Sequence, residues 1–207
     1  MKKARVFGVL MFVGMMASAF RIRDVEPLSQ AERKYAIDYF TAAKQRLLDD
    51  VKGLSDAQLN FRADSSRWSI TQCVEHIAVS ESMIWQWVQM TMQQPATPEK
   101  RSEVKTDVET MVKGMTDRSH KFQAPEMLRP DGKFADEKAA LNAYVLRRDS
   151  TIAYIGNTQD DLKGHFITHP AFGTMDLYQA LVMLAAHSVR HTMQVEEVKS
   201  NPNFPKQ

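Results

Sequence analysis

The sequence offers little from which to build covalent cross-links. Its 207 residues include one cysteine, Cys73, so no disulfide can form within the chain, and stability must come from packing and from any bound metal. A single thiol could still form a disulfide with a second copy of the chain and so link a homodimer. Cys73 lies in an apolar helical pattern, however, where a free cysteine behaves as a small buried hydrophobe. This position favours a buried, inert thiol.

The N-terminal apolar run, residues 6–16, is too short to span a bilayer comfortably. Basic residues precede it, and Ala17-Ser18-Ala19 follows it. This succession is typical of a secretory signal peptide, so residues 1–19 are expected to be cleaved off. The sequence thus predicts an exported protein, periplasmic or secreted, that meets the membrane only through this peptide. An uncleaved anchor is the alternative.

Neither sign of charge is in clear excess. The full chain has 27 Lys and Arg against 25 Asp and Glu, and removal of residues 1–19 leaves 24 basic and 25 acidic residues. A near-neutral mature chain lacks the basic surface that nucleic acids require, which excludes them as partners. Residues 20–207 are long enough for one domain with a substantial core, expected at about residues 29–200.

No stretch alternates polar and apolar residues for long enough to predict a sheet, whereas several show helical spacing. Apolar positions and capping residues predict an all-α fold with four long helices. Their expected ranges are 29–52, 69–94 and 136–156, with a last helix that is capped by Thr174 or Asp176 and ends near Ser200. Residues 94–133 contain four prolines and one weaker amphipathic helix, and 164–173 are expected to form a loop.

Two histidines lie on the apolar stripe of the last helix. His187 and His191 are four residues apart, so they project from one face, one turn above the other. A buried imidazole costs free energy unless it is bonded, and one metal ion would satisfy both rings at once. The alternative is a pair of core histidines satisfied by the protein itself.

A third histidine borders the core of the second long helix. His76 shares a face with Cys73 and Ser80, and a neighbouring helix running in either direction would bring it to the pair. It is the natural third ligand of a metal site. His120, in contrast, lies in a polar segment and is expected at the surface.

Three further residues are candidates for binding substrate or supporting the ligands. Arg148 is a charge on an apolar stripe; such a side chain either reaches the rim or clamps a carboxylate of the substrate or the protein. His169 precedes Pro170 in the loop and is placed to line the mouth of a site. Glu75 precedes His76 and is expected to support the ligands or to face solvent, which leaves no general base assigned; Glu81 is one further option.

Three motifs stand in a recognisable order: Trp68-Ser69 leading into Glu75-His76, the loop 169–173 with the sequence HPAFG, and His187-x-x-Arg190-His191. Over about residues 29–200 the chain resembles the DinB-like superfamily. The resemblance implies a four-helix up-down bundle with a long crossover between the second and third core helices. It also implies a divalent metal, zinc or nickel, held by His76, His187 and His191.

The resemblance says less about the reaction. Some relatives are similar to thiol-dependent transferases and isomerases, whose cofactors are cytosolic, and export argues against that reaction here. Three neutral imidazoles with an open fourth position are typical of a catalytic metal site. The first hypothesis is therefore an exported hydrolase or group transferase acting on a small molecule. The alternative is a non-catalytic metal- or ligand-binding bundle, which a fourth protein ligand such as Cys73 or His169 would favour.

Overall fold

The computed structural model describes residues 27–206, so the predicted signal peptide lies outside the described residues. Six α-helices, two 3-10 helices and one two-stranded sheet make up this part of the chain. Their bounds, in order, are α1 Gln30–Val51, α2 Asp56–Leu59, α3 Ile70–Met92, η1 Pro98–Glu103, α4 Val108–Thr116, η2 Glu126–Leu128, α5 Glu137–Asn157, β1 Phe166–His169, β2 Gly173–Asp176 and α6 Leu177–Lys199.

The long helices begin where their capping residues predict. Ser29, Ser69 and Asp176 each form a capping box with the residue three positions on, and Asp136 caps α5 by accepting the N–H of Ala139. Each cap satisfies N–H groups that the first turn of a helix leaves unpaired. Gly53, with φ of +75°, follows the end of α1 in the left-handed conformation that glycine adopts without strain.

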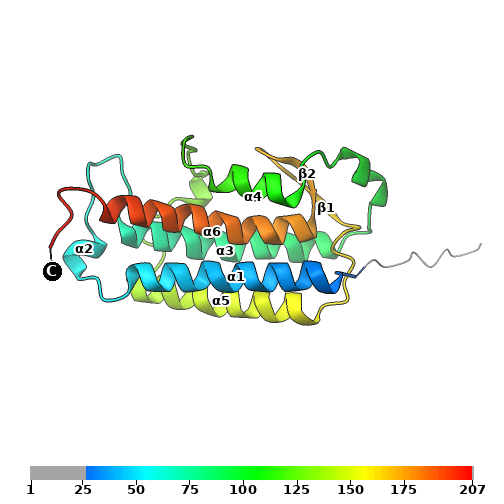
Figure 1. Ribbon diagram of the computed structural model, residues 1–207, viewed down its shortest axis with the longest axis horizontal. Helices are drawn as coiled ribbons and strands as arrows, with labels where there is room; N and C mark the ends of the chain where they lie inside the picture. Colours follow the sequence, from blue (N-terminus) through cyan, green and yellow to red (C-terminus); the bar gives the residue numbers. More distant parts are fainter. Residues whose placement is uncertain (1–26, 207) are drawn as a thin grey trace, which may run out of the picture.

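The four long helices form a bundle in which α1 and α6 run one way and α3 and α5 the other (Figure 1). Ion pairs confirm the directions. Arg46 pairs with Glu196 and Asp50 with Lys199 along the parallel helices α1 and α6. The predicted all-α bundle and its crossover are thus confirmed. Because residues 93–136 return the chain to the end at which α3 began, α3 and α5 run in the same direction.

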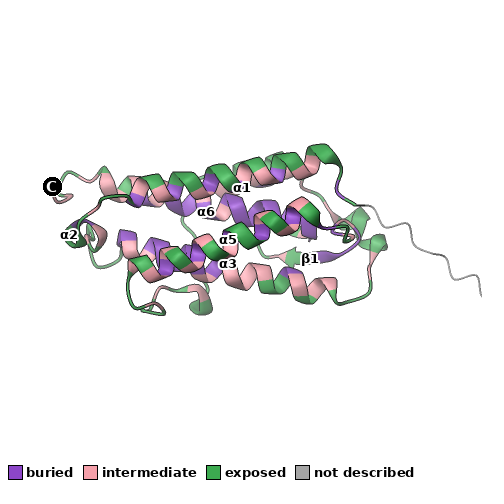
Figure 2. Cartoon of the chain, turned by 90° about the horizontal axis from the view of Figure 1, so that it is seen from below, coloured by how far each residue is buried: buried purple, intermediate pink, exposed green. Residues whose placement is uncertain are grey.

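The core follows the inward faces of these helices (Figure 2). The predicted stripe of α1 is buried, and α6 is the most completely buried element, in keeping with its central place between α1, α3 and α4. Cys73 is fully buried, which agrees with the inert thiol expected from its pattern. Among residues 27–206, no helix is long and apolar enough to cross a membrane.

The crossover runs along the outside of the bundle and is fastened to α6. Helix α4 packs on α6, and the side-chain amide of Gln179 donates to the carbonyl of Thr106 at 2.6 Å. Arg190 of α6 donates to the carbonyl of Met115, in the last turn of α4, and to those of Asp117 and His120 just after it. One buried guanidinium therefore holds the end of α4 against the bundle.

The loop expected at 164–173 is partly wrong. Residues 166–176 form an antiparallel hairpin in which Phe166 pairs with Asp176 and His169 with Gly173. Its strands have four residues each, too few for alternation to stand out in a sequence. The hairpin tip packs on α4, since a Cβ added to Gly114 would lie 3.1 Å from the Phe172 ring.

Candidate metal centre

Helices α3 and α6 bring His76, His187 and His191 together. The two helices pack antiparallel, and His187 and His191 project toward α3 one turn apart, as their spacing predicts. One ring nitrogen from each histidine lies within 4.8 Å of the other two. His76 and His191 are buried, and His187 is half-buried. Of the three histidines, His187 is therefore the one most accessible to solvent.

The spacing of the ring nitrogens fits a single metal ion. Nε2 of His76 lies 3.3 Å from Nε2 of His187. Two nitrogens bound to one tetrahedral zinc, each at about 2.0–2.1 Å, lie roughly 3.3 Å apart. The His191 ring centroid is 4.3 Å from that of His76 and 4.6 Å from that of His187, with the planes steeply inclined. Inclined rings let three lone pairs point at one centre.

The crossover fixes the tautomer of His76. Nδ1 of His76 lies 2.6 Å from the carbonyl oxygen of Leu128, at the end of η2. A carbonyl oxygen only accepts, so Nδ1 must carry the proton and donate it. In the neutral ring, Nε2 is then left with a free lone pair facing His187. A hydrogen bond from the far ring nitrogen is the usual way that proteins orient a metal-ligating histidine.

His191 is oriented in the same way by its own helix. Its Nδ1 lies 3.0 Å from Oε1 of Gln194, one turn further along α6. Arg118 of the crossover donates to the same oxygen at 3.3 Å and makes two bonds of 2.8 and 2.7 Å to Glu197. Because Arg118 is a donor, Gln194 must present its carbonyl, and this again places the proton on Nδ1.

Electrostatics keep all three rings neutral. Burial lowers the pKa of His76. For His187 and His191 the pKa is lowered well below its ordinary value, first by burial and then by the charge that a neighbouring histidine would carry. Neutral imidazole is the form that binds a metal. The arrangement therefore holds the three ligands in their binding state at neutral pH.

Trp68 covers one side of the cluster. Its ring centroid lies 4.9 Å from that of His76 and 5.9 Å from that of His191. Trp68 stands just before Ser69, the cap of α3, so the same local turn that starts the helix also lays the indole over the ligands. This contact limits the access of water to the buried rings.

These geometric features agree with the comparison of the chain with known proteins. Residues 39–195 match the DinB superfamily. The chain belongs to the DinB superfamily. Among curated proteins, the uncharacterized protein YuaE of Bacillus subtilis (strain 168) is 25% identical over 161 residues, which span 77% of this chain and 94% of YuaE.

A solved four-helix bundle shares the architecture. Bacillus subtilis YfiT, described as a probable metal-dependent hydrolase with an unusual four-helix bundle topology, aligns with a TM-score of 0.57. The alignment covers 84% of this chain and 89% of YfiT at 19% sequence identity. At that identity the likeness supports the fold. In a simple bundle each helix runs opposite to the one before it. Here α3 and α5 run in the same direction, because a long crossover joins them.

The other candidate residues lie outside the cluster. Oε1 of Glu75 accepts the backbone N–H groups of Asp131, Gly132 and Lys133 at 2.8–3.0 Å, so Glu75 is buried and holds the crossover. His169 stacks on Phe172 at the hairpin tip and accepts the N–H of Ala171. Neither contacts the three ligands through a described hydrogen bond.

Arg148 does not reach the rim, which was the first of its two interpretations. It is fully buried, and its Nη2 donates to Glu81 and to Ser188, each at 2.8 Å. The second interpretation, a clamp on a carboxylate of the protein, describes it. Neither Cys73 nor His169 joins the three histidines as a fourth ligand in the part of the chain that the structure describes. His120 is exposed, as expected.

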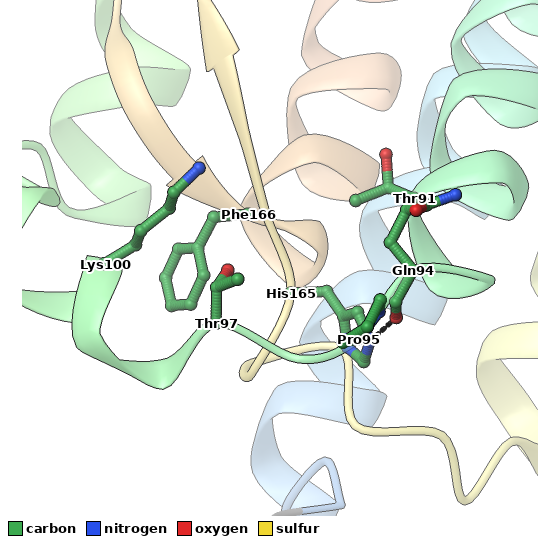
Figure 3. A pocket seen from close by; sticks show the side chains of 7 residues that line it. All are labelled: Thr91, Gln94, Pro95, Thr97, Lys100, His165 and Phe166. Carbon is green, nitrogen blue, oxygen red and sulfur yellow. Dashed lines mark hydrogen bonds between the residues drawn. The ribbon is translucent and has the colours of Figure 1, made fainter.

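Two cavities differ in their relation to the histidines. One, of about 370 Å³, lies beside the cluster, since Trp68 and Gln194 line it and both contact His191. The other, of about 270 Å³, lies at the end of α3, where His165 is bonded to the carbonyl of Gln94 (Figure 3). None of the three clustered histidines lines either cavity. The first cavity is the nearer of the two to them, because two of its lining residues, Trp68 and Gln194, contact His191.

Proposed function

We propose that this protein is an exported metalloprotein of the DinB superfamily. In this proposal His76, His187 and His191 hold one divalent ion, zinc or nickel, and the protein acts on a small molecule as a hydrolase or group transferase. The observation that carries the proposal is the convergence of three ring nitrogens within 4.8 Å of one another, two of them only 3.3 Å apart. The description of YfiT as a probable metal-dependent hydrolase supports the reaction class.

The protein groups have distinct roles in this proposal. Three imidazoles occupy three positions of a tetrahedral site, and no fourth described ligand closes it. Leu128 and Gln194 hold the protons of two ligands away from the metal. A bound divalent ion supplies Lewis acidity, which lowers the pKa of a ligand water or thiol and polarises a carbonyl. The cavity beside Trp68 provides room for a small substrate.

One observation favours the alternative of a non-catalytic metal-binding bundle. The two carboxylates nearest to His76 in α3 are already engaged. Glu75 accepts three backbone N–H groups, and Glu81 pairs with Arg148. A hydrolase generally needs a base within hydrogen-bond reach of the attacking group. Neither carboxylate of α3 is therefore free to act as that base.

The decisive experiment measures metal content in protein purified without a histidine tag. We expect one divalent ion per chain in the native protein and in His120→Ala, and loss of most of it in His191→Ala, which removes one of three ligands. Equal metal content in the two variants would contradict the site. Activity screens against ester, amide and thiol-transfer substrates then separate the enzyme from the binding protein. No turnover by metal-loaded protein would favour the alternative.

A further inference from the structure

The buried side chain of Arg148 connects all four long helices. Its guanidinium lies over the ring of Phe40 of α1 at 4.5 Å and over the ring of Tyr144 of α5 at 5.1 Å. Its Nη2 donates to Glu81 of α3 and to Ser188 of α6. Arg148 and Glu81 have no exposed surface, and Ser188 has 1%. One side chain of α5 thus contacts residues of α1, α3, α5 and α6.

The buried pair of Glu81 and Arg148 is not expected to add much to the stability of the fold. Glu81 Oε1 and the Nε and Nη1 atoms of Arg148 are buried and have no hydrogen-bond partner among the described residues. Desolvating an ion pair costs several kcal/mol per ion, so apolar residues of similar volume are often as stable or more stable. Buried polar groups have a better attested use in fixing how helices align.

The bridge lies next to the metal ligands on two helices. Glu81 is five residues beyond His76 in α3, about 7.5 Å along the helix axis. Ser188 directly follows His187 in α6. The same two helices that must align to bring His76 Nε2 within 3.3 Å of His187 Nε2 are thus tied together through Arg148. Metal geometry tolerates displacements of only about 0.5 Å.

We propose that Glu81, Arg148 and Ser188 are positioning residues that fix the axial alignment of α3 and α6 and so assemble the three-histidine metal site. This inference rests on the proposed metal site and adds a role for a buried ion pair that touches no ligand directly. Helix α5 supplies no ligand and packs on α3 and α1, yet through Arg148 it determines where the ligands of α3 and α6 meet.

The first test removes the α6 end of the bridge. Ser188→Ala deletes one hydroxyl and leaves the Glu81–Arg148 pair intact. Thr192→Val is the matched control, because Thr192 directly follows His191, is buried, and bonds only to the Ser188 carbonyl of its own helix. We expect zinc affinity to fall about tenfold in Ser188→Ala, at the low end of the roughly 10–100-fold losses that follow removal of a ligand's own hydrogen-bond partner, because this hydroxyl acts through the helix and contacts no ligand. We expect a change of less than about twofold in Thr192→Val.

Cobalt(II) provides a readout that loss of stability alone would not change. The intensity and position of its visible bands report coordination geometry, so we expect an altered spectrum in metal-saturated Ser188→Ala and a native spectrum in Thr192→Val. Matching affinities and spectra in Ser188→Ala and the native protein would overturn the inference. If the native protein bound neither zinc nor cobalt, the metal site itself, and this inference with it, would be rejected.

A second variant separates positioning from folding. Replacing the pair together, as Glu81→Leu with Arg148→Met, removes both charges and keeps an apolar core of similar volume. We expect this double variant to remain folded, with native-like circular dichroism, and to bind zinc at least tenfold more weakly. Native affinity in the folded double variant would show that packing alone aligns the helices and would reject the proposal.

Discussion

At the scale of single residues, three imidazoles within 4.8 Å of one another resist protonation together. Burial and the charge of a neighbouring ring lower the pKa of His187 and His191, whereas the same side chains in the unfolded chain titrate near 6.5. Below that pH the histidines of the unfolded chain become protonated, whereas those of the folded site stay neutral. This difference links folding stability to pH.

We therefore predict that the metal-free protein, kept in a chelator, loses stability as the pH falls from 7.5 to 5.5. The contribution of these rings is complete above pH 6.5 and is lost below it, by up to about 1.4 kcal/mol per pH unit for each ring that titrates only when unfolded. Urea unfolding at each pH measures it. His187→Gln should lower the slope, while the exposed His120→Ala should leave it unchanged; an unchanged slope in His187→Gln would contradict the prediction.

The residues of the site could be predicted to very different extents. His187 and His191 are neighbours by helix geometry alone, and His76 could be added from its place beside an apolar face. Leu128 and Arg118 could not, because they reach the ligands only through the path of an irregular crossover. For Arg148 the sequence left two positions open, and only the location of Glu81 decides between them.

At the scale of elements, Arg190 is one of several side chains that attach the crossover to the bundle. Arg190 donates to three carbonyls in the last turn of α4 and just after it, among them Met115 at 3.1 Å and His120 at 2.6 Å. A planar guanidinium can bond several acceptors at once, which a lysine ammonium does less well. Arg190 thus joins three carbonyls at the end of α4 to one side chain of α6.

We predict that Arg190→Met destabilises the protein by about 2 kcal/mol, since it removes several hydrogen bonds to a charged group. Urea unfolding gives the free energy, and amide hydrogen exchange should show lost protection in residues 115–122 while α1 and α5 keep theirs. Arg190→Lys is expected to recover less than half of the loss. Uniform loss of protection throughout the bundle would show that the contact has no local role.

Elements with strong local signals were predictable to within a few residues. Capping side chains define the starts of α1, α3, α5 and α6, and Gly53 marks the end of α1. The hairpin of residues 166–176 was not predictable, because two four-residue strands depend on each other and on contact with α4. The parallel course of α3 and α5 likewise depends on where the crossover ends, not on local spacing.

At the scale of the whole molecule, export is the expectation with the clearest chemical readout. A basic start, a short apolar run and Ala17-Ser18-Ala19 predict removal of residues 1–19. Mass spectrometry of the protein secreted by its native host should find Phe20 as the first residue. An intact Met1 on a protein recovered from the cytosol would contradict both cleavage and export.

The fastening of the crossover has a consequence for the lifetime of a bound ion. The outer partners of two ligands come from this peripheral segment, Leu128 for His76 and Arg118 for the Gln194–His191 pair. Peripheral segments open far more often than a whole domain unfolds. Such an opening frees the His76 ring to turn and releases Gln194, the partner of His191, from Arg118 while the helices stay packed. Metal exchange would then follow the opening rate of residues 117–129, and ion release can be rapid in a protein whose bundle unfolds slowly.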